Sequence, residues 1–245
     1  MEKRYLEDGI LSGAKLFNPN YHIESNLYAK EEELLKLFKQ GFNTPEKEKT
    51  INMLGEYEND ECSIPKFLIY GRNRANPFMG YGMKYYKDYK CLENKLLSLS
   101  FKSRMIIARK IAQLIENFED EKLVYTDLHT GNIIVRYNNI VLVDFDSAMY
   151  ESIIGPNLYK KLLGESYQNL CSLLLNIIYS IDIPGKPFEC IISSNRDLFE
   201  KTANKKQKII LDGSFDDEKT DYHPSDYLDS FTEEYVEETK KKLIL

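Results

Sequence analysis

The sequence lacks several features that would assign it to a well-marked class of protein. Its four cysteines show no paired spacing, which argues against a disulfide framework and against a cysteine-based zinc site. No apolar stretch reaches the roughly 18 residues of a membrane span, and no secretory signal, internal repeat or low-complexity tract is present. We therefore expect a cytoplasmic protein with no membrane span; secretion as an effector without a classical signal peptide remains an alternative.

An excess of positive charge is also missing. The chain has 33 Lys and Arg against 39 Asp and Glu, a net charge of −6, and the two signs are mixed along it. Because nucleic acids and anionic membranes attract basic surfaces, we expect neither as a partner. The 245 residues, 42% of them hydrophobic, are enough for one sizeable core or two small lobes.

The most informative segment that is present lies between residues 124 and 146. Asp127 is followed five residues later by Asn132, and Asp144 follows after two short apolar runs. Phosphoryl transfer from a nucleotide needs a carboxylate that orients the attacking hydroxyl, and an amide and a second carboxylate that hold metal ions. We expect these roles for Asp127, Asn132 and Asp144 respectively. The alternative is that all three are ordinary loop or strand-end residues.

The apolar residues around this segment predict a β-hairpin. Ile133–Val135 and Ile140–Val143 are apolar runs rich in β-branched residues, and Asn138–Asn139 between them is a turn pair. Pairing of the two strands would bring Asn132 and Asp144 to the same edge.

The segment resembles the catalytic loop and metal-binding motif of protein kinases. It is also similar to the Asp-Leu-His-x-Gly-Asn form found in aminoglycoside and choline phosphotransferases. The resemblance implies an α+β, two-lobed protein kinase-like fold, with a reduced β-sheet in an N-lobe (residues 1–86) and a mainly helical C-lobe (87–245). It also implies ATP and Mg²⁺ as cofactors.

Four positions depart from the protein kinase pattern. Tyr125 and Thr126 stand where His-Arg is usual, and Asp146 stands where the third motif residue is usually Gly. His129 replaces a lysine of Ser/Thr kinases, which favours the small-molecule branch.

Two helices are predicted around the motif. Apolar residues recur at three and four residues over 101–118, with Ser100 as the N-cap. Residues 167–181 are apolar on nearly every face, which is typical of a buried helix. By resemblance, Asn169 stands where an aspartate often anchors the catalytic loop.

The first 86 residues should bind the nucleotide. Residues 13–17 read as a strand, and Lys15 on it resembles the catalytic lysine that contacts the phosphates. Residues 24–39 read as a helix, on which Glu31 would face the core and pair with Lys15. The alternative is a solvated, Glu-rich helix face.

Two strand-like runs, 65–70 and 78–86, follow in the sequence. The second resembles the strand that leads into the interlobe hinge of kinases. Met83 would then lie at the back of the adenine pocket, and backbone groups of Lys84 and Tyr86 would bind the adenine edge. These tyrosines could equally be packing residues of an edge strand.

No G-x-G-x-x-G motif is present, and only 14 residues precede Lys15. Three functions follow from the sequence. The first is an atypical protein kinase that phosphorylates a protein hydroxyl, and the second is a small-molecule kinase of the aminoglycoside or choline type. The third is a pseudokinase that acts as a binding scaffold.

Overall fold

The structure, a computed structural model, describes all residues except 18–23, 72–76, 182–187, 219–220 and 244–245. The chain forms two compact units. Unit 1 comprises Met1–Tyr89 and Val141–Met149, and unit 2 comprises Lys90–Ile140 and Tyr150–Leu245. The sequence placed the boundary after residue 86, whereas the structure places it after residue 89 and adds residues 141–149 to unit 1.

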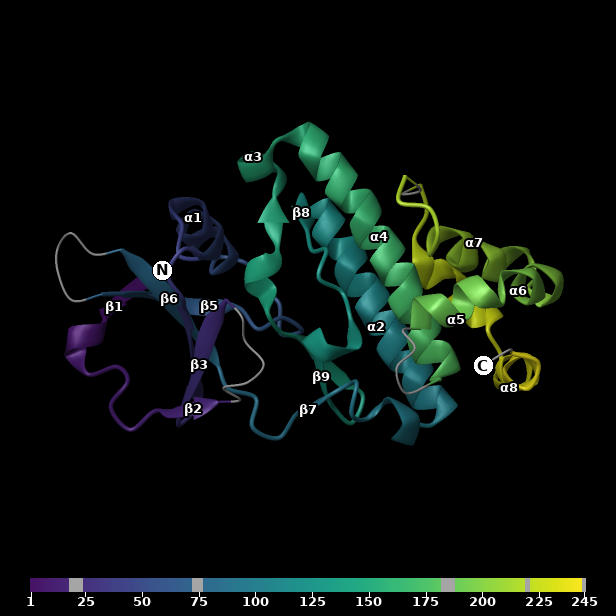
Figure 1. Ribbon diagram of the computed structural model, residues 1–245, viewed down its shortest axis with the longest axis horizontal. Coiled ribbons are helices and arrows are strands. Elements are labelled where there is room, and N and C mark those ends of the chain that lie inside the picture. Colours follow the sequence, from purple (N-terminus) through teal and green to yellow (C-terminus); the bar gives the residue numbers. More distant parts are fainter. Residues whose placement is uncertain (18–23, 72–76, 182–187, 219–220, 244–245) are drawn as a thin grey trace. The chain divides into compact units, whose positions relative to one another are not determined.

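Unit 1 is built on a six-stranded sheet in the order β1-β5-β6-β4-β3-β2 (Figure 1). β1 is parallel to β5, and the other neighbours are antiparallel. The strands are β1 (Glu2–Tyr5), β2 (Lys15–Phe17), β3 (Ser25–Lys30), β4 (Glu33–Phe38), β5 (Pro65–Tyr70) and β6 (Phe78–Lys84). The strands β2 and β3 both precede β4 in the sequence and lie on one side of it in the sheet.

The prediction of a helix over 24–39 is wrong, since this segment forms the hairpin β3–β4. The chain reverses at Glu31, which has a left-handed backbone with φ 50°. β4 lies between β3 and β6, and both of its faces are covered by apolar side chains. A strand buried on both faces has no simple alternation of apolar and polar residues, so its pattern resembles that of a buried helix.

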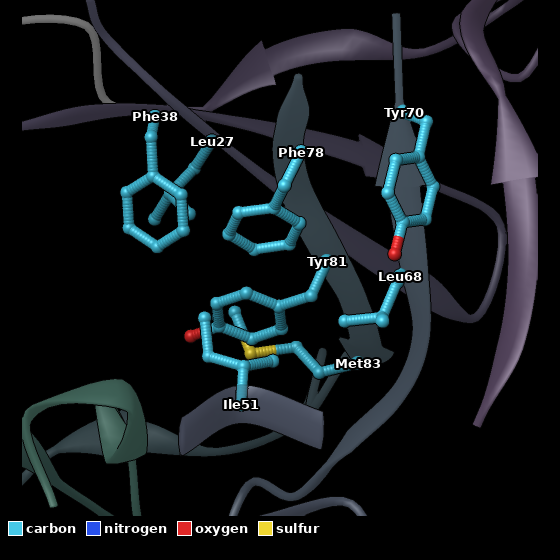
Figure 2. Close-up of a cluster of buried hydrophobic side chains, with 8 residues drawn as sticks. All are labelled: Leu27, Phe38, Ile51, Leu68, Tyr70, Phe78, Tyr81 and Met83. Carbon is cyan, nitrogen blue, oxygen red and sulfur yellow. The ribbon is translucent and has the colours of Figure 1, made fainter. Parts of the chain in front are cut away.

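Two apolar clusters cover the sheet of unit 1. One cluster contains Phe38, Tyr81, Met83 and neighbouring side chains, which meet Ile51 of the helix α1 (Pro45–Leu54), as Figure 2 shows. The cluster on the other face consists of Ile10, Leu35, Leu37, Phe67 and Ile69.

Helix α1 was not predicted from the sequence, although its start carries a clear signal. The side chain of Thr44 accepts a hydrogen bond from the backbone N–H of Lys47, and Pro45 occupies the first turn.

Unit 2 is mainly helical, and α2 (Phe101–Asp120) and α4 (Pro156–Tyr179) pack against each other (Figure 1). Ser100 caps α2 as predicted, accepting from the N–H of Ser103. The buried helix predicted at 167–181 is confirmed as part of α4, which begins earlier. The remaining helices after α2 are α3 (Glu151–Ile154), α5 (Phe188–Ser194), α6 (Arg196–Thr202), α7 (Lys205–Gly213) and α8 (Glu233–Lys240).

Short elements complete the fold. The predicted hairpin is present as β9 (Ile133–Arg136) and β10 (Asn139–Leu142), and β9 also pairs with β7 (Lys90–Cys91). A second small sheet joins β8 (Leu123–Val124) and β11 (Met149–Tyr150). The 3₁₀ helices are η1 (Leu6–Asp8), η2 (Leu96–Ser98), η3 (Thr130–Asn132), η4 (Phe145–Ser147) and η5 (Pro224–Ser230). Among the described residues, no helix is long and apolar enough to cross a membrane.

Candidate functional site

In unit 2, Asn132 fixes the loop that carries Asp127. Its side-chain Nδ2 donates to Asp127 Oδ2 at 2.8 Å and to the Asp127 carbonyl oxygen at 3.0 Å. It also lies 3.1 Å from the hydroxyl of buried Tyr125. Asn132 is itself buried, whereas the side chain of Asp127 keeps 48% of its surface exposed. The loop therefore holds a carboxylate in one orientation and leaves it accessible to a substrate.

Helix α4 anchors the same loop. Asn169 Nδ2 donates to the Thr126 carbonyl oxygen at 2.7 Å, and Ser166 Oγ donates to the Tyr125 carbonyl oxygen at 2.7 Å. Asn169 thus makes the anchoring contact that was expected at its position. These bonds tie the backbone carbonyls of two consecutive loop residues to α4.

His129 faces Asp127 within this loop. The backbone N–H of Gly131 donates to His129 Nδ1 at 3.1 Å, so in the neutral ring the proton resides on Nε2. That nitrogen lies 3.7 Å from Asp127 Oδ1. A side chain at position 131 would collide with the imidazole, since a Cβ there would lie 2.7 Å from its Cε1.

In unit 1, the buried lysine is Lys36, at the centre of β4. It lies opposite Leu27 of β3 and Tyr81 of β6, so its side chain shares the face of the sheet that α1 covers. Its ammonium group forms ion pairs with Asp144 and, at 2.6 Å, with Asp146. Only 7% of the Lys36 side chain is exposed. A buried lysine of this kind needs charged partners to remain protonated.

Asp146 is the most enclosed member of this cluster, with 2% of its side chain exposed. Its Oδ1 accepts from Lys36 and, at 2.8 Å, from the Tyr81 hydroxyl. Its Oδ2 lies 3.0 Å from the ammonium of Lys47 on α1, which also donates to the Asp146 carbonyl oxygen at 2.9 Å. Five residues together form this lysine–aspartate cluster: Lys36, Lys47, Asp144, Asp146 and Tyr81.

The electrostatics of the cluster favour the ionised forms of Lys36 and Asp146, whereas burial raises the pKa of Asp144 above its usual value even though Lys36 acts in the opposite direction. Burial by itself lowers the pKa of Lys36, but the carboxylates of Asp146 and Asp144 outweigh it and raise that pKa above its usual value. Burial likewise favours the neutral form of Asp146, yet Lys36 and Lys47 lower its pKa to about 2. Lys36 and Asp146 therefore form a charged pair at neutral pH.

The candidate cation ligands have the right chemistry for Mg²⁺. Asp144 follows β10, adopts a left-handed backbone with φ 59°, and keeps 42% of its side chain exposed. The amide nitrogen of Asn132 is occupied by its three acceptors, so the oxygen of that amide points away from them. Hard cations such as Mg²⁺ prefer carboxylate and carbonyl-type oxygens. Both residues therefore fit the predicted role, each within its own unit.

The residues predicted to grip the phosphates lie elsewhere. Lys15 is exposed on the edge strand β2, two strands away from β4. Glu31 is in the turn between β3 and β4, not on a helix, and this removes the basis for its pairing with Lys15. The lysine that is buried in this sheet and paired with Asp144 is Lys36, not Lys15. Two further strands of the sheet, β2 and β3, precede Lys36 in the sequence. Residues 18–23, between these two strands, lie outside the described part.

The predicted adenine-binding residues lie at the end of β6. Met83 is buried in the cluster of Figure 2, and its sulfur lies 3.3 Å from Ser63 Oγ. Lys84 ends the strand, and its ammonium lies 5.0 Å from the ring centroid of Tyr86. Burial raises the pKa of Tyr86 to about 12. Adenine binding by these residues stays a prediction.

The sequence contained signals for some of the residues that were missed. Lys36 is the one charged residue in the apolar run Leu34-Leu-Lys-Leu-Phe38, and burial of its neighbours on both sides carries it into the core. Lys47 and Tyr81 gave no such signal, because their roles depend on Asp146, which is 99 and 65 residues away respectively.

Comparison with known proteins supports the fold. No protein-family model and no curated protein matches the sequence. A solved structure that is similar is the PAN3 pseudokinase of Neurospora crassa, with a TM-score of 0.62 and 10% sequence identity. The match covers 93% of this chain and 61% of that one, so the chain spans under two thirds of that protein's length. The chain has a protein kinase-like fold.

Proposed function

We propose that this chain is an ATP-dependent phosphotransferase, and that it acts as an atypical protein kinase on a protein hydroxyl. The observation that carries the proposal is Lys36, a buried lysine in the middle of a kinase-like sheet whose ammonium is paired with Asp144. A buried ammonium next to an accessible carboxylate suits the binding of phosphate oxygens together with a cation.

The residues of each unit would contribute different parts of the reaction. Lys36 binds oxygens of the nucleotide phosphates, and Asp144 and Asn132 would hold Mg²⁺, which neutralises charge on those phosphates when bound. Asp127 orients the acceptor hydroxyl and accepts its proton. The hydroxyl oxygen forms a bond to the γ-phosphorus while the bond from that phosphorus to the β–γ bridging oxygen breaks, and ADP leaves.

Asn132 has a second part in this scheme. Its hydrogen bond to Asp127 Oδ2 holds one carboxylate oxygen, so that the other, Oδ1, is the oxygen that faces the acceptor and His129. A positioned carboxylate contributes mainly by orientation.

Two other functions have their own support. The run from Asp127 to Asn132, with His129 in place of lysine, favours a small-molecule acceptor. The absence of a G-x-G-x-x-G motif is the sequence feature that favours a pseudokinase acting as a binding scaffold, and the similar solved structure, which shares the fold, is also that of a pseudokinase.

The test is a comparison of purified variants with radiolabelled ATP and Mg²⁺ on protein mixtures and on metabolite pools. We expect Asp144→Ala and Asp127→Asn to lower turnover by orders of magnitude, with Asp127→Asn leaving nucleotide affinity almost unchanged. Asp212→Ala, at an exposed position on α7, is the matched control.

The outcomes separate the three functions. Label on a protein supports the leading proposal, and label on a metabolite supports the small-molecule kinase. Calorimetric binding of MgATP without transfer to any acceptor supports the pseudokinase. Full activity of Asp144→Ala would contradict the assignment of this site.

A further inference from the structure

We infer that Asp146 is the carboxylate that positions Lys36, and that Lys47 of α1 holds Asp146 in place for this task. This inference rests on the proposed function, in which Lys36 binds the nucleotide phosphates. In the protein kinase pattern the partner of that lysine is a glutamate from a helix. Here the carboxylate would come instead from the motif that follows β10, and the helix would supply a lysine.

The acidic residues of α1 are directed elsewhere. Glu48 accepts a hydrogen bond from the Tyr70 hydroxyl, and Glu46 is exposed. The residue of α1 that reaches the lysine–aspartate cluster is Lys47, through both the side chain and the carbonyl oxygen of Asp146. The carboxylate that pairs with Lys36 therefore comes from Asp146 and not from α1.

The hydrogen bonds of Asp146 suit a positioning role. Its Oδ1 accepts from Lys36 and from Tyr81, and its Oδ2 faces Lys47. Both oxygens are thus engaged, and only 2% of the side chain is exposed. A carboxylate that is held from three sides cannot rotate freely, so it fixes the ammonium group that it binds.

The charges of the cluster also explain why a second lysine is needed. Lys36 alone would face two carboxylates, and the surplus negative charge would be buried, which is costly. Lys47 balances Asp146, so that two ammonium groups face two carboxylates. If Asp144 then binds a cation, Lys36 still has Asp146 as a partner.

Asp146 also links two elements of unit 1. Lys47 lies in the first turn of α1, and Lys36 lies on β4, so their shared carboxylate joins this helix to the lysine strand. Asp146 and Lys47 would act on the reaction through Lys36, and they are positioning residues.

The first set of test variants changes Lys47, whose side chain is 23% exposed. We expect Lys47→Gln to lower kcat/KM on the order of 10- to 100-fold and to weaken MgADP binding in calorimetry. Lys47→Arg keeps the charge and should restore most of both. Lys49→Gln, at an exposed position on the same helix, should change neither.

The second set moves the carboxylate back to the helix. Lys47→Glu and Asp146→Asn should each reduce activity and MgADP affinity. The double variant, with a glutamate on α1 and a neutral residue at 146, should recover a substantial part of both, because Lys36 regains one carboxylate partner. Thermal unfolding of each variant shows whether it is folded. If Asp146→Asn does not fold, the result with Lys47→Gln alone tests the inference.

Failure of this inference differs from failure of the proposed function. The inference is overturned and the function stands if three results occur together. Lys36→Met abolishes MgADP binding, Lys47→Gln behaves like wild type, and the double variant is no more active than Asp146→Asn alone. If wild type and Lys36→Met bind MgADP equally, Lys36 binds no phosphate, and both are overturned.

Discussion

At the scale of single residues, the carboxyl group of Asp146 shows how charged neighbours can outweigh burial. Its pKa falls from an ordinary value of 3.8 to about 2, because Lys36 and Lys47 outweigh the effect of burial. A carboxyl whose pKa is lowered by folding stabilises the folded state above its unfolded pKa, and this stabilisation is lost as the pH falls toward the folded value. The shift corresponds to roughly 2 kcal/mol.

We therefore expect wild type and Asp146→Asn to differ in Tm by a constant amount between pH 7 and 5, with wild type the more stable. Below about pH 4 the difference should shrink, since wild type is losing the same charge. The measurement is thermal unfolding across this range, and Asp212→Asn serves as the exposed control. A difference that stays constant down to pH 2 would show that Asp146 is not held as an anion.

At the scale of elements, the sheet of unit 1 depends on the close approach of β6 to β4. A Cβ at Gly80 would lie 1.9 Å from the carbonyl oxygen of Lys36, so only glycine fits there without movement of the strand that carries the lysine. Backbone atoms, unlike the end of a flexible side chain, cannot move aside at little cost.

Gly80→Ala should destabilise the protein by about 2 kcal/mol, which corresponds to about 4–8 °C in Tm for a chain of this size. It should also weaken MgADP binding, because β4 must shift. Gly55→Ala is the matched control: the three atoms nearest to its Cβ would all belong to the flexible side chain of Met1, which can move. Equal stability of the two variants in thermal unfolding would contradict the close packing of β6 on β4.

Unit 2 shows how a helix fixes a loop. Asn169 and Ser166 of α4 bind the backbone of residues 125 and 126, and Asn132 binds Asp127 from within the loop. The proposed catalytic carboxylate is thus supported by a buried helix. A loop that is hydrogen-bonded to a helix holds a reacting group more precisely than an unsupported loop does.

At the scale of the whole molecule, nucleotide binding should stabilise the chain. A ligand at a hundred times its Kd adds about 2.7 kcal/mol to the free energy of unfolding, or about 5–10 °C in Tm. We expect this shift with MgADP in the wild type, and a much smaller one without Mg²⁺ or in Asp144→Ala.

The control for this experiment is Lys66→Met, an exposed lysine of β5, which should keep the full shift, whereas Lys36→Met should lose most of it. Retention of the shift in Lys36→Met, or its absence in wild type, would argue against nucleotide binding in unit 1.

The sequence by itself determined the segments whose signals are local. The hairpin that follows Asn132, the cap of α2 at Ser100 and the buried character of α4 were all predicted, because turn residues, caps and periodicity act within a few residues of one another. The roles of Asp127, Asn132 and Asp144 were proposed from their spacing along one such segment.

Only the tertiary structure decided which lysine pairs with Asp144. Lys15 and Lys36 both lie on strands, but β2 is an edge strand open to solvent and β4 is enclosed between β3 and β6. The partners of Lys36 are 108 and 110 residues away, and so the pairing leaves no trace in local sequence. A charged side chain acquires its role from the residues that bury it, and burial is set by strand order and helix packing, which the chain determines only as a whole.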